Sequence, residues 1–193
     1  MKLDDAINNR VSMRGFTSKK VRWDLVLEAI DAASKVPFAG NIDNLKYIIV
    51  QNQDLKDQIA RHCQQNWIAD ASIIVVLCSD EIKLEKMYFE RGLVYSRQQA
   101  GAAIQNFLLK ITDLGLDSCW VGAYADELIK QLLKIPEYIN IEAVLPIGYG
   151  KGKPRKIKKS PLETKIFWDQ WQKRGERQLR GKKPIYFKDA QTW

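Results

Sequence analysis

The stretch NNRVSMRGFTSKKV, residues 8–21, places two guanidinium groups and a hydroxyl at alternate positions: Arg10, Ser12 and Arg14. In a helix, the two arginines would lie on one face four residues apart, where like charges repel by about 0.2–0.5 kcal/mol. In an extended chain, all three side chains would lie on one side, because that period is two. Either geometry concentrates positive charge and hydrogen-bond donors, which suits an anionic ligand. A solvated basic surface turn is the alternative.

Groups that could bind a metal or act as nucleophiles are few in the rest of the chain. The only histidine is His62, and the three cysteines, Cys63, Cys78 and Cys119, are far apart and form no CxxC pair. These spacings argue against a zinc or iron site and against a disulfide framework, and they favour a reducing compartment. We interpret Cys119 as a small packed hydrophobic residue and His62 as a surface or capping residue.

Length and composition are those of an ordinary folded protein. The 193 residues, 46% hydrophobic and 28% charged, fit one domain, possibly with an appendage. No apolar run approaches the roughly 18–20 residues of a membrane span. The N-terminal MKLDDAINNR lacks the basic and apolar regions of a secretory signal. We therefore expect no membrane association and a cytoplasmic location.

The net charge of +8 is distributed unevenly along the chain. Residues 1–150 contain 17 basic and 19 acidic residues, whereas residues 151–193 contain 14 basic and 4 acidic residues. A nearly neutral body therefore precedes a strongly basic C-terminal segment. Such a segment can bind nucleic acid, can be solvated, or can pack on another subunit.

Hydrophobic periodicity predicts alternating helices and strands. The expected helices span residues 2–10, 23–35, 54–66, 98–114 and 125–135, and the expected strands span 47–52, 71–80, 117–124 and 142–150. Residues 81–97 are either a helix or a mobile segment. Because the strand at 71–80 is apolar on both faces, both faces of its sheet should be covered. Small residues at 100–103 allow either close helix packing or the approach of a flat ligand. The elements predict a layered α/β or α+β fold with a mixed sheet.

Four stretches carry a family pattern in one order over residues 5–165. They are RVSMR with Phe16, PFAGN at 37–41, AAIQNFLL at 102–109 continuing into GLDSCWVG at 115–122, and LPIGYG at 145–150 followed by KSPLE at 159–163. Together they resemble the FMN-dependent nitroreductase family. The resemblance implies an α+β fold, with a mixed central sheet flanked by helices, in an intertwined homodimer. It also implies an FMN-binding domain over 1–165 and a basic extension, 166–193, that packs on the partner subunit.

The resemblance assigns the phosphate of FMN to the early basic segment. Its ligands would be Arg10, Ser12 and Arg14, which suit a dianion through charge-assisted hydrogen bonds. The family supplies a further cation near the end of the chain, and here the matching residue is Lys159, with Lys156 and Lys158 close by. A lysine neutralises the phosphate as a point charge without the fork geometry of arginine.

The resemblance assigns the flavin ring to other segments. The loop that reaches the ring, commonly from the partner subunit, corresponds to Pro37, Phe38, Ala39 and Asn41. A backbone N–H at Val121 or Gly122 would face the N5–O4 edge, and a glycine allows close backbone approach to a ring. Gln64 would hydrogen-bond the pyrimidine edge.

The implied activity is ping-pong reduction of nitroaromatics, quinones or similar small acceptors by NADH or NADPH, with FMN carrying the chemistry. Departures from the family pattern lie around the ring and the active-site mouth, at Phe38, Ile42–Leu45 and Gln99.

Two alternative functions stay open. One is a flavin- or nucleotide-binding protein without turnover, whose basic tail binds a nucleic-acid or protein partner. The other is a dehalogenase-type flavoenzyme of the same fold.

For the basic tail we favour packing on the partner subunit over nucleic-acid binding. The PIYF segment at 184–187 would add a strand or an edge to the other monomer. A freely solvated tail would not contain so many apolar residues, which are Leu162, Ile166, Trp168, Trp171, Ile185, Tyr186 and Phe187.

Overall fold

The computed structural model describes residues 1–154, 159–161 and 164–171. The chain divides into two compact units, Met1–Arg155 and Lys156–Trp193, and each is described by itself. Several predicted features lie outside the described residues: Lys156, Lys158, Leu162 and the PIYF segment at 184–187. Their expected roles stay predictions, as does the domain boundary at residue 165.

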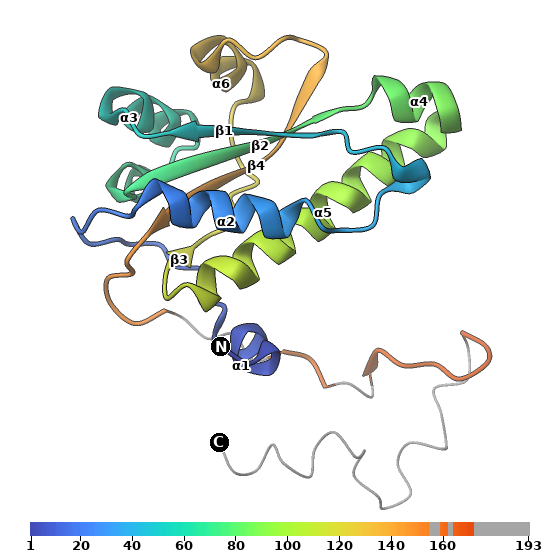
Figure 1. The fold of residues 1–193 in the computed structure, drawn as a ribbon, viewed down its shortest axis with the longest axis horizontal. Coiled ribbons are helices and arrows are strands. Elements are labelled where there is room, and N and C mark those ends of the chain that lie inside the picture. Colours follow the sequence, from blue (N-terminus) through green and yellow to red (C-terminus); the bar gives the residue numbers. More distant parts are fainter. Residues whose placement is uncertain (155–158, 162–163, 172–193) are drawn as a thin grey trace, which may run out of the picture. The chain divides into compact units, whose positions relative to one another are not determined.

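The first unit alternates helices and strands in nearly the predicted order (Figure 1). Its α-helices are α1 (Leu3–Asn9), α2 (Trp23–Ala33), α3 (Gln53–His62), α4 (Ile82–Tyr88), α5 (Glu90–Asp113) and α6 (Asp126–Leu133). Two short 3₁₀ helices are η1 (Ala39–Asn41) and η2 (Asn66–Asp70). The strands are β1 (Leu45–Val50), β2 (Ile73–Asp80), β3 (Asp117–Ser118) and β4 (Ile139–Gly148).

The strands form one sheet in the order β1-β2-β4-β3, in which the strand ladders are antiparallel. An isolated parallel bridge joins Ser12, which belongs to none of the four strands, to Ser118 at the β3 edge. The central pair, β2 and β4, extends from Ile73 opposite Ile147 to Asp80 opposite Ile139, and its register shifts by one residue between Leu77 and Cys78. The predicted α+β class is confirmed, whereas the prediction of a mixed sheet is wrong for the described strands, whose three ladders are all antiparallel.

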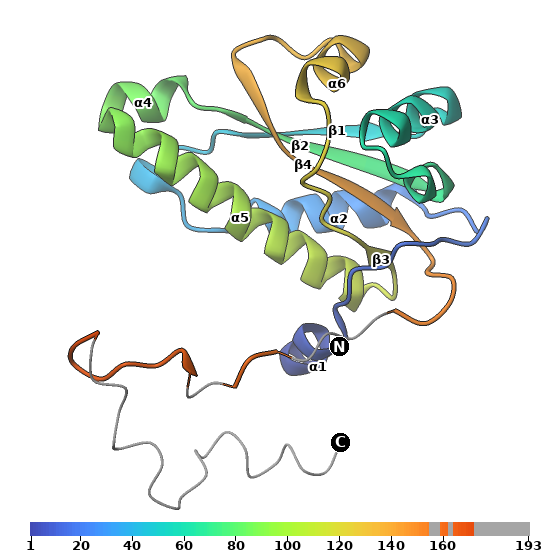
Figure 2. The same ribbon diagram turned by 180° about the vertical axis from the view of Figure 1, so that it is seen from behind.

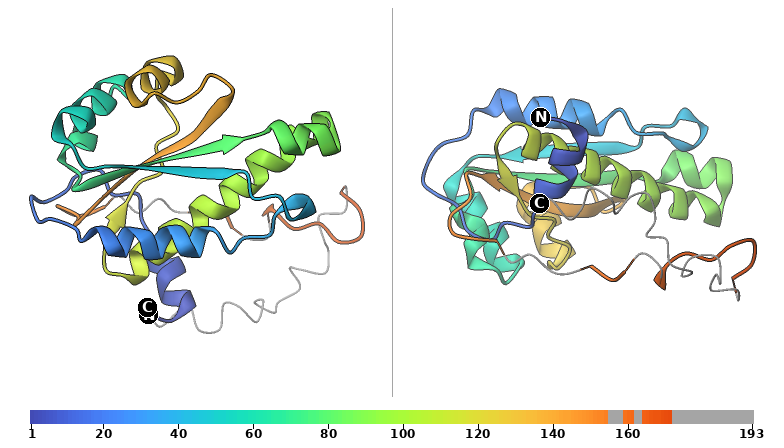
Figure 3. Two further views of the ribbon diagram at one scale, coloured as in Figure 1. Left: turned by 45° about the horizontal axis from the view of Figure 1, so that its top comes forward. Right: turned by 90° about the horizontal axis from the view of Figure 1, so that it is seen from below.

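Helices cover both faces of the sheet (Figures 1 and 3). Helices α2 and α5 lie on one face, and α3 and α6 lie on the other. Strand β2 shows why two covers are needed. Its odd-numbered side chains from Ile73 to Leu77 join the core under α2 and α5, whereas Ile74, Val76 and Cys78 join the core under α3 and α6. Each fully buried valine or isoleucine contributes about 1.5–3 kcal/mol. The expected coverage of both faces is confirmed.

Two predicted elements differ in detail from the structure. Residues 81–97 are helical, because they form α4 and the start of α5, and Phe89 separates the two helices with a φ of 52°. The strand predicted at 117–124 is reduced to β3. After Ser118 the chain pairs with β4 again only at Val121, which exchanges two hydrogen bonds of 3.0 Å with Val144.

Small and sulfur-containing residues serve packing. Ala100 and Ala103 are 1% and 0% exposed on the inner face of α5, as close helix packing requires. The three cysteines are free and buried, which confirms the packing interpretation of Cys119. Burial raises the pKa of the Cys63 and Cys78 thiols to about 12, so neither is a thiolate nucleophile at neutral pH.

In the second unit, the rings of Phe167 and Trp171 are stacked with their centroids 4.4 Å apart. Trp168 is 47% exposed and Trp171 is 78% exposed. Among the described residues of both units, no helix combines the length and the apolar character that a membrane crossing needs.

Candidate functional site

The basic segment that follows α1 is extended. A backbone bridge pairs Ser12 with Ser118 of β3, and the Met13 N–H donates to the Ser118 carbonyl (3.0 Å). Extended backbone turns successive side chains to opposite sides. Met13 is accordingly buried, at 7% exposed, whereas Ser12 and Arg14 are exposed and Arg10 is half-buried. Of the two geometries considered for this segment, the extended chain is therefore the one observed, with the two arginines and the hydroxyl on one side.

Two glycines allow this segment to approach the end of β4. A Cβ atom on Gly150 would lie 2.6 Å from Met13 Cε and 2.7 Å from Asp117 Oδ2, and the Gly150 N–H donates to that same oxygen (2.9 Å). A Cβ atom on Gly148 would lie 2.7 Å from Cδ1 of Phe16. Backbone contacts and close packing therefore hold the segment, and its outward side chains are not needed for that purpose.

The outward side chains carry uncompensated positive charge. Among the described residues, neither Arg10 nor Arg14 forms an ion pair. The adjacent Ser118 hydroxyl is buried and lacks a hydrogen-bond partner within the same residues. Two guanidinium groups without carboxylate partners, next to the Ser12 hydroxyl, fit the several acceptor oxygens of a phosphate dianion.

The predicted backbone donor is restricted to one of the two candidates. The Val121 N–H donates to the Val144 carbonyl (3.0 Å) and is therefore used inside the sheet. Gly122 is exposed, and a Cβ atom on it would have no neighbour within 4 Å. If the ring edge is bound by a backbone donor of this pair, that donor is the N–H of Gly122.

Gln64 lies close to this stretch. It follows α3 with a φ of 54°, a left-handed conformation that is uncommon for a residue other than glycine, and its side chain is exposed. The carbonyl of His62 accepts a hydrogen bond from the Ala125 N–H (3.0 Å), which joins the end of α3 to the chain just after Gly122. The structure therefore places Gln64 and Gly122 in one region.

The predicted ring loop is fixed to α5 by a buried chain of polar side chains. The Ala39 N–H donates to Oε1 of Gln99 (2.8 Å), whose Nε2 donates to Oδ1 of Asn44 (2.7 Å). Asn44 in turn donates to the Ser96 hydroxyl (2.8 Å). The three side chains are 0–4% exposed. From the sequence, Gln99 was identified only as a departure from the family pattern, and its role in holding the loop was not predicted. The available signal was the pair Ser96 and Gln99, polar residues three apart in a long helix.

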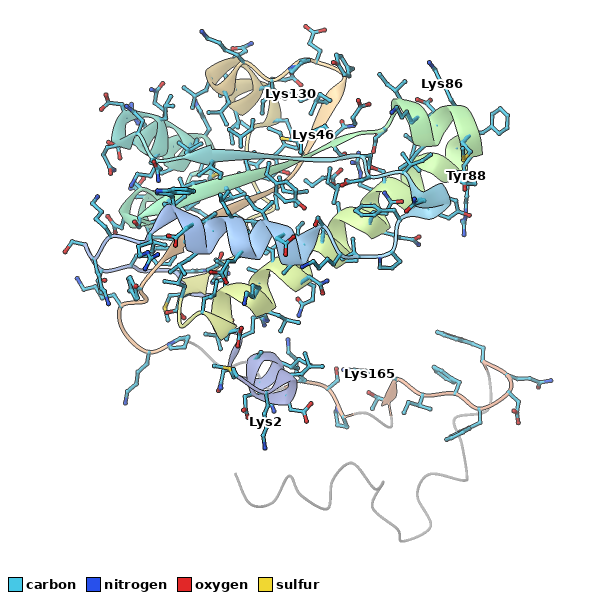
Figure 4. The ribbon with its side chains drawn as sticks, viewed as in Figure 1. Lys2, Lys46, Lys86, Tyr88, Lys130 and Lys165 are labelled. Carbon is cyan, nitrogen blue, oxygen red and sulfur yellow. The ribbon has the colours of Figure 1, made fainter. Side chains whose placement is uncertain are left out.

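The loop itself contains two consecutive residues in the left-handed region, Gly40 and Asn41, both with a φ of 57°. A Cβ atom on Gly40 would lie 2.7 Å from the Tyr88 hydroxyl oxygen and 3.0 Å from Sδ of Met87. Helix α4 therefore packs directly on the loop, and Figure 4 shows the Tyr88 side chain of α4 beside it. Pro37 and Asn41 are exposed, whereas Phe38 and Ala39 are half-buried.

One copy of the chain does not bring all of these parts together. The basic segment pairs with β3, just beyond the C-terminal end of α5, whereas the loop binds Gln99 in the N-terminal half of that helix. About 21 Å of helix separates Gln99 from Asp113 at 1.5 Å per residue. Figure 2 shows η1 and β3 toward opposite ends of α5. Lys159 belongs to the second unit, and its contact with phosphate stays a prediction.

Comparison with known proteins identifies the family. The Nitroreductase family model matches residues 7–72 and 63–149. A protein of Methanothermobacter thermautotrophicus, provisionally named NADH dehydrogenase/NAD(P)H nitroreductase, is 31% identical over 155 residues, which cover 78% of each chain.

Solved structures agree with this match. A nitroreductase family protein from Clostridium novyi NT superposes with a TM-score of 0.72 at 25% identity, covering 78% of this chain and 86% of its own. An oxidised iodotyrosine deiodinase bound to FMN and 3-iodo-L-tyrosine has a TM-score of 0.76 at 19% identity, covering 88% of this chain and 100% of its own. The latter likeness concerns the fold alone. The family match, the relative at 31% identity and the α+β architecture show that the chain belongs to the nitroreductase family of oxidoreductases.

Proposed function

We propose that the chain is one protomer of a homodimeric, FMN-dependent oxidoreductase. It would use NADH or NADPH to reduce nitroaromatics, quinones or similar small acceptors in a ping-pong cycle. The observation that carries this proposal is the extended basic segment, in which Arg10, Ser12 and Arg14 project to one side without carboxylate partners among the described residues. No membrane association and a cytoplasmic location are part of the proposal.

Each part of the site would have a separate task. Arg10 and Arg14 would neutralise the phosphate, and the Ser12 hydroxyl would donate to it. The Gly122 N–H would stabilise negative charge on the N5–O4 edge of the ring. Gln64 would bind the pyrimidine edge, and Lys159 would add a cation at the phosphate. Bound FMN supplies the hydride acceptance and donation that no protein side chain can supply.

The loop at 37–41 supports the homodimer. Within one protomer it is fixed about 21 Å of helix away from the end of α5 that lies near the basic segment, so a second copy would have to supply a loop to the first copy's ring. Large apolar side chains near the loop, on and next to α4 and α5, are exposed: Met87, Phe89, Leu93 and Val94. Light scattering after size-exclusion chromatography tests this point, and a monomer that retains bound flavin would contradict it.

The direct test of function is an absorption spectrum of the purified protein. We expect flavin bands after purification or after addition of FMN, and bleaching of those bands by NADH or NADPH without oxygen. A colourless protein that takes up no FMN would contradict the proposal. Flavin that binds but is reduced by neither nicotinamide would instead favour a flavin-binding protein without turnover.

A second candidate is reductive removal of a halogen. It is favoured by the fold shared with the deiodinase bound to 3-iodo-L-tyrosine, and by the departures at Ile42–Leu45 near the predicted ring loop. The reduced protein should be offered 3-iodo-L-tyrosine and a nitroaromatic in parallel, with iodide release and reduction of the nitro group as the readouts. Faster iodide release would favour the dehalogenase.

A further inference from the structure

A cavity of about 450 Å³ opens beside α3 and η2, between them and the chain that leads into α2. None of its lining residues belongs to the predicted flavin site. Its charged side chains are three lysines and one carboxylate, namely Lys20, Lys56, Lys151 and Asp70. Its volume is within the roughly 300–1,000 Å³ typical of sites for small ligands.

Lys56 is a buried cation in this cavity, at 2% exposed. Its ammonium group donates to the carbonyl of Ala71 (2.6 Å) and, at 3.4 Å, to the carbonyl of Ser72. These neutral acceptors satisfy hydrogen bonds but do not cancel the charge. Burial first, and the charge of Lys20 second, lower the pKa of Lys56, although Asp57 and Asp70 oppose this effect.

The other two lysines also lack compensation. Among the described residues, no ion pair includes Lys20, Lys56 or Lys151. Asp70 is exposed at the cavity wall and is paired with none of them. A buried charge without an opposite charge is costly, and a nearby like charge adds to that cost. The arrangement is therefore more stable with an anion present.

Hydroxyl groups complete the lining. The oxygen of Thr17 is buried and has no hydrogen-bond partner among the described residues. The Ser72 oxygen accepts from the Val21 N–H (2.8 Å), so its own proton stays available for donation. Lysine cations together with hydroxyl donors match the acceptor oxygens of a phosphate group.

We propose that this cavity binds the phosphate group of a small phosphomonoester, separately from the predicted flavin site. The dianion lies among Lys20, Lys56 and Lys151 and relieves the repulsion between Lys20 and Lys56. The room beyond one phosphate holds the organic part of the ligand, and Asp70 accepts a hydrogen bond from a ligand hydroxyl there.

The test is a calorimetric titration of inorganic phosphate into the full chain saturated with FMN, at constant ionic strength set with chloride. Saturation keeps the predicted flavin-phosphate site filled. We expect Lys20→Met to weaken phosphate binding about tenfold, the factor that corresponds to about 1.4 kcal/mol. Lys20 is exposed, so this change should leave the fold intact. Lys151→Met should act in the same direction.

The matched control is Lys86→Met. Lys86 is an exposed lysine on α4 (Figure 4), at the opposite end of the sheet from α3 in Figures 1 and 2. The Lys86→Met change should leave phosphate binding unchanged. Absent binding, or equal binding by wild type, Lys20→Met and Lys86→Met, would overturn the proposal.

A further variant separates this site from the proposed flavin site. If the protein takes up no FMN, the same titration is run on wild type and Arg14→Ala. Phosphate binding that is weakened by Lys20→Met and unchanged by Arg14→Ala supports the cavity even then. Binding that is weakened by Arg14→Ala and unchanged by Lys20→Met belongs to the basic segment and overturns the cavity proposal. Acetate, tested in parallel, should bind more weakly than phosphate because it carries one charge.

Discussion

The basic segment at 10–14 and the loop at 37–41 are held in place by opposite means. The segment is held by backbone hydrogen bonds to β3 and by close contact with glycines, and its polar side chains project outward. The loop is held by side chains, in a buried polar chain that runs through Gln99, Asn44 and Ser96. The side chains expected to bind the ligand are therefore different from the side chains that stabilise the fold. Outward side chains of the segment can be removed without damage to the fold, whereas the polar side chains behind the loop cannot.

The largest effect should come from Gln99→Leu. The change leaves the partly buried Ala39 N–H and the buried side-chain oxygen Oδ1 of Asn44 without their partners, and each such group costs about 1–3 kcal/mol. We expect the free energy of unfolding to fall by about 2–4 kcal/mol in urea denaturation. Gln98→Leu, at an exposed neighbouring position, is the control and should change it little. Equal stability of the two variants would show that the polar chain does not hold the loop.

Arg14→Ala tests the other region. It should weaken FMN binding by about 1.5–3 kcal/mol, as for a lost hydrogen bond to a charged group, with little change in the free energy of unfolding of the apoprotein. Fluorescence titration with FMN measures the first quantity, and urea denaturation measures the second. Arg22→Ala removes another exposed arginine, which pairs with Asp24, and should leave FMN binding unchanged. Unaltered affinity in Arg14→Ala would remove this residue from the phosphate site.

Gly148→Ala should disturb the segment through its backbone support. The new Cβ atom would lie 2.7 Å from the buried ring of Phe16, and such overpacking costs about 1–3 kcal/mol. Gly101→Ala is the matched control, because its Cβ atom would have only Trp120 nearby, at 3.9 Å. In a helix interior that change should add about 0.5–1 kcal/mol. Thermal unfolding compares the two variants, and a Gly148→Ala protein as stable as wild type would refute the close-contact argument.

The smallest effect should come from Asp113→Asn at the end of α5. The N-terminal ammonium group pairs with Asp113 (2.7 Å) and, together with Lys110, lowers the pKa of its carboxyl. A lowered pKa means that the pair stabilises the fold above the ordinary value of 3.8 and that this contribution is lost as the pH falls through the lowered pKa. At neutral pH the variant should lose at most about 1 kcal/mol, as for a surface pair. Urea denaturation should show this difference vanishing well below pH 3.8; a constant difference would contradict the assignment.

Local patterns predicted most of the fold. The uninterrupted apolar run of β2 predicted a strand covered on both faces, and the structure confirms it because α2, α5, α3 and α6 bury alternate side chains of that strand. The shortening of the strand predicted at 117–124 was not predictable, because it depends on which residues of β4 stand opposite. The helical state of 81–97 was left open because its sequence has no clear apolar stripe.

The site could be predicted only in part. Alternation in RVSMR allowed an extended segment with its basic side chains on one side, and the structure confirms that geometry. Two features depend on contacts far apart in the chain. The Val121 N–H is occupied by Val144, and Gln99 lies behind the Ala39 peptide. Ser96 and Gln99, polar residues three apart in a long helix, could have indicated a buried polar contact, but a single sequence does not say which distant residues supply the partners. The flavin contacts of Lys159 and of the loop stay predictions.

The most direct test of the central claim compares FMN with riboflavin, which lacks the phosphate, in wild type and in Arg14→Ala. If the basic segment binds the phosphate, wild type should prefer FMN strongly, and Arg14→Ala should lose at least about tenfold of that preference, while riboflavin affinity stays the same in both proteins. An FMN preference that is the same in wild type and Arg14→Ala, or a wild type that binds both flavins equally, would contradict the account.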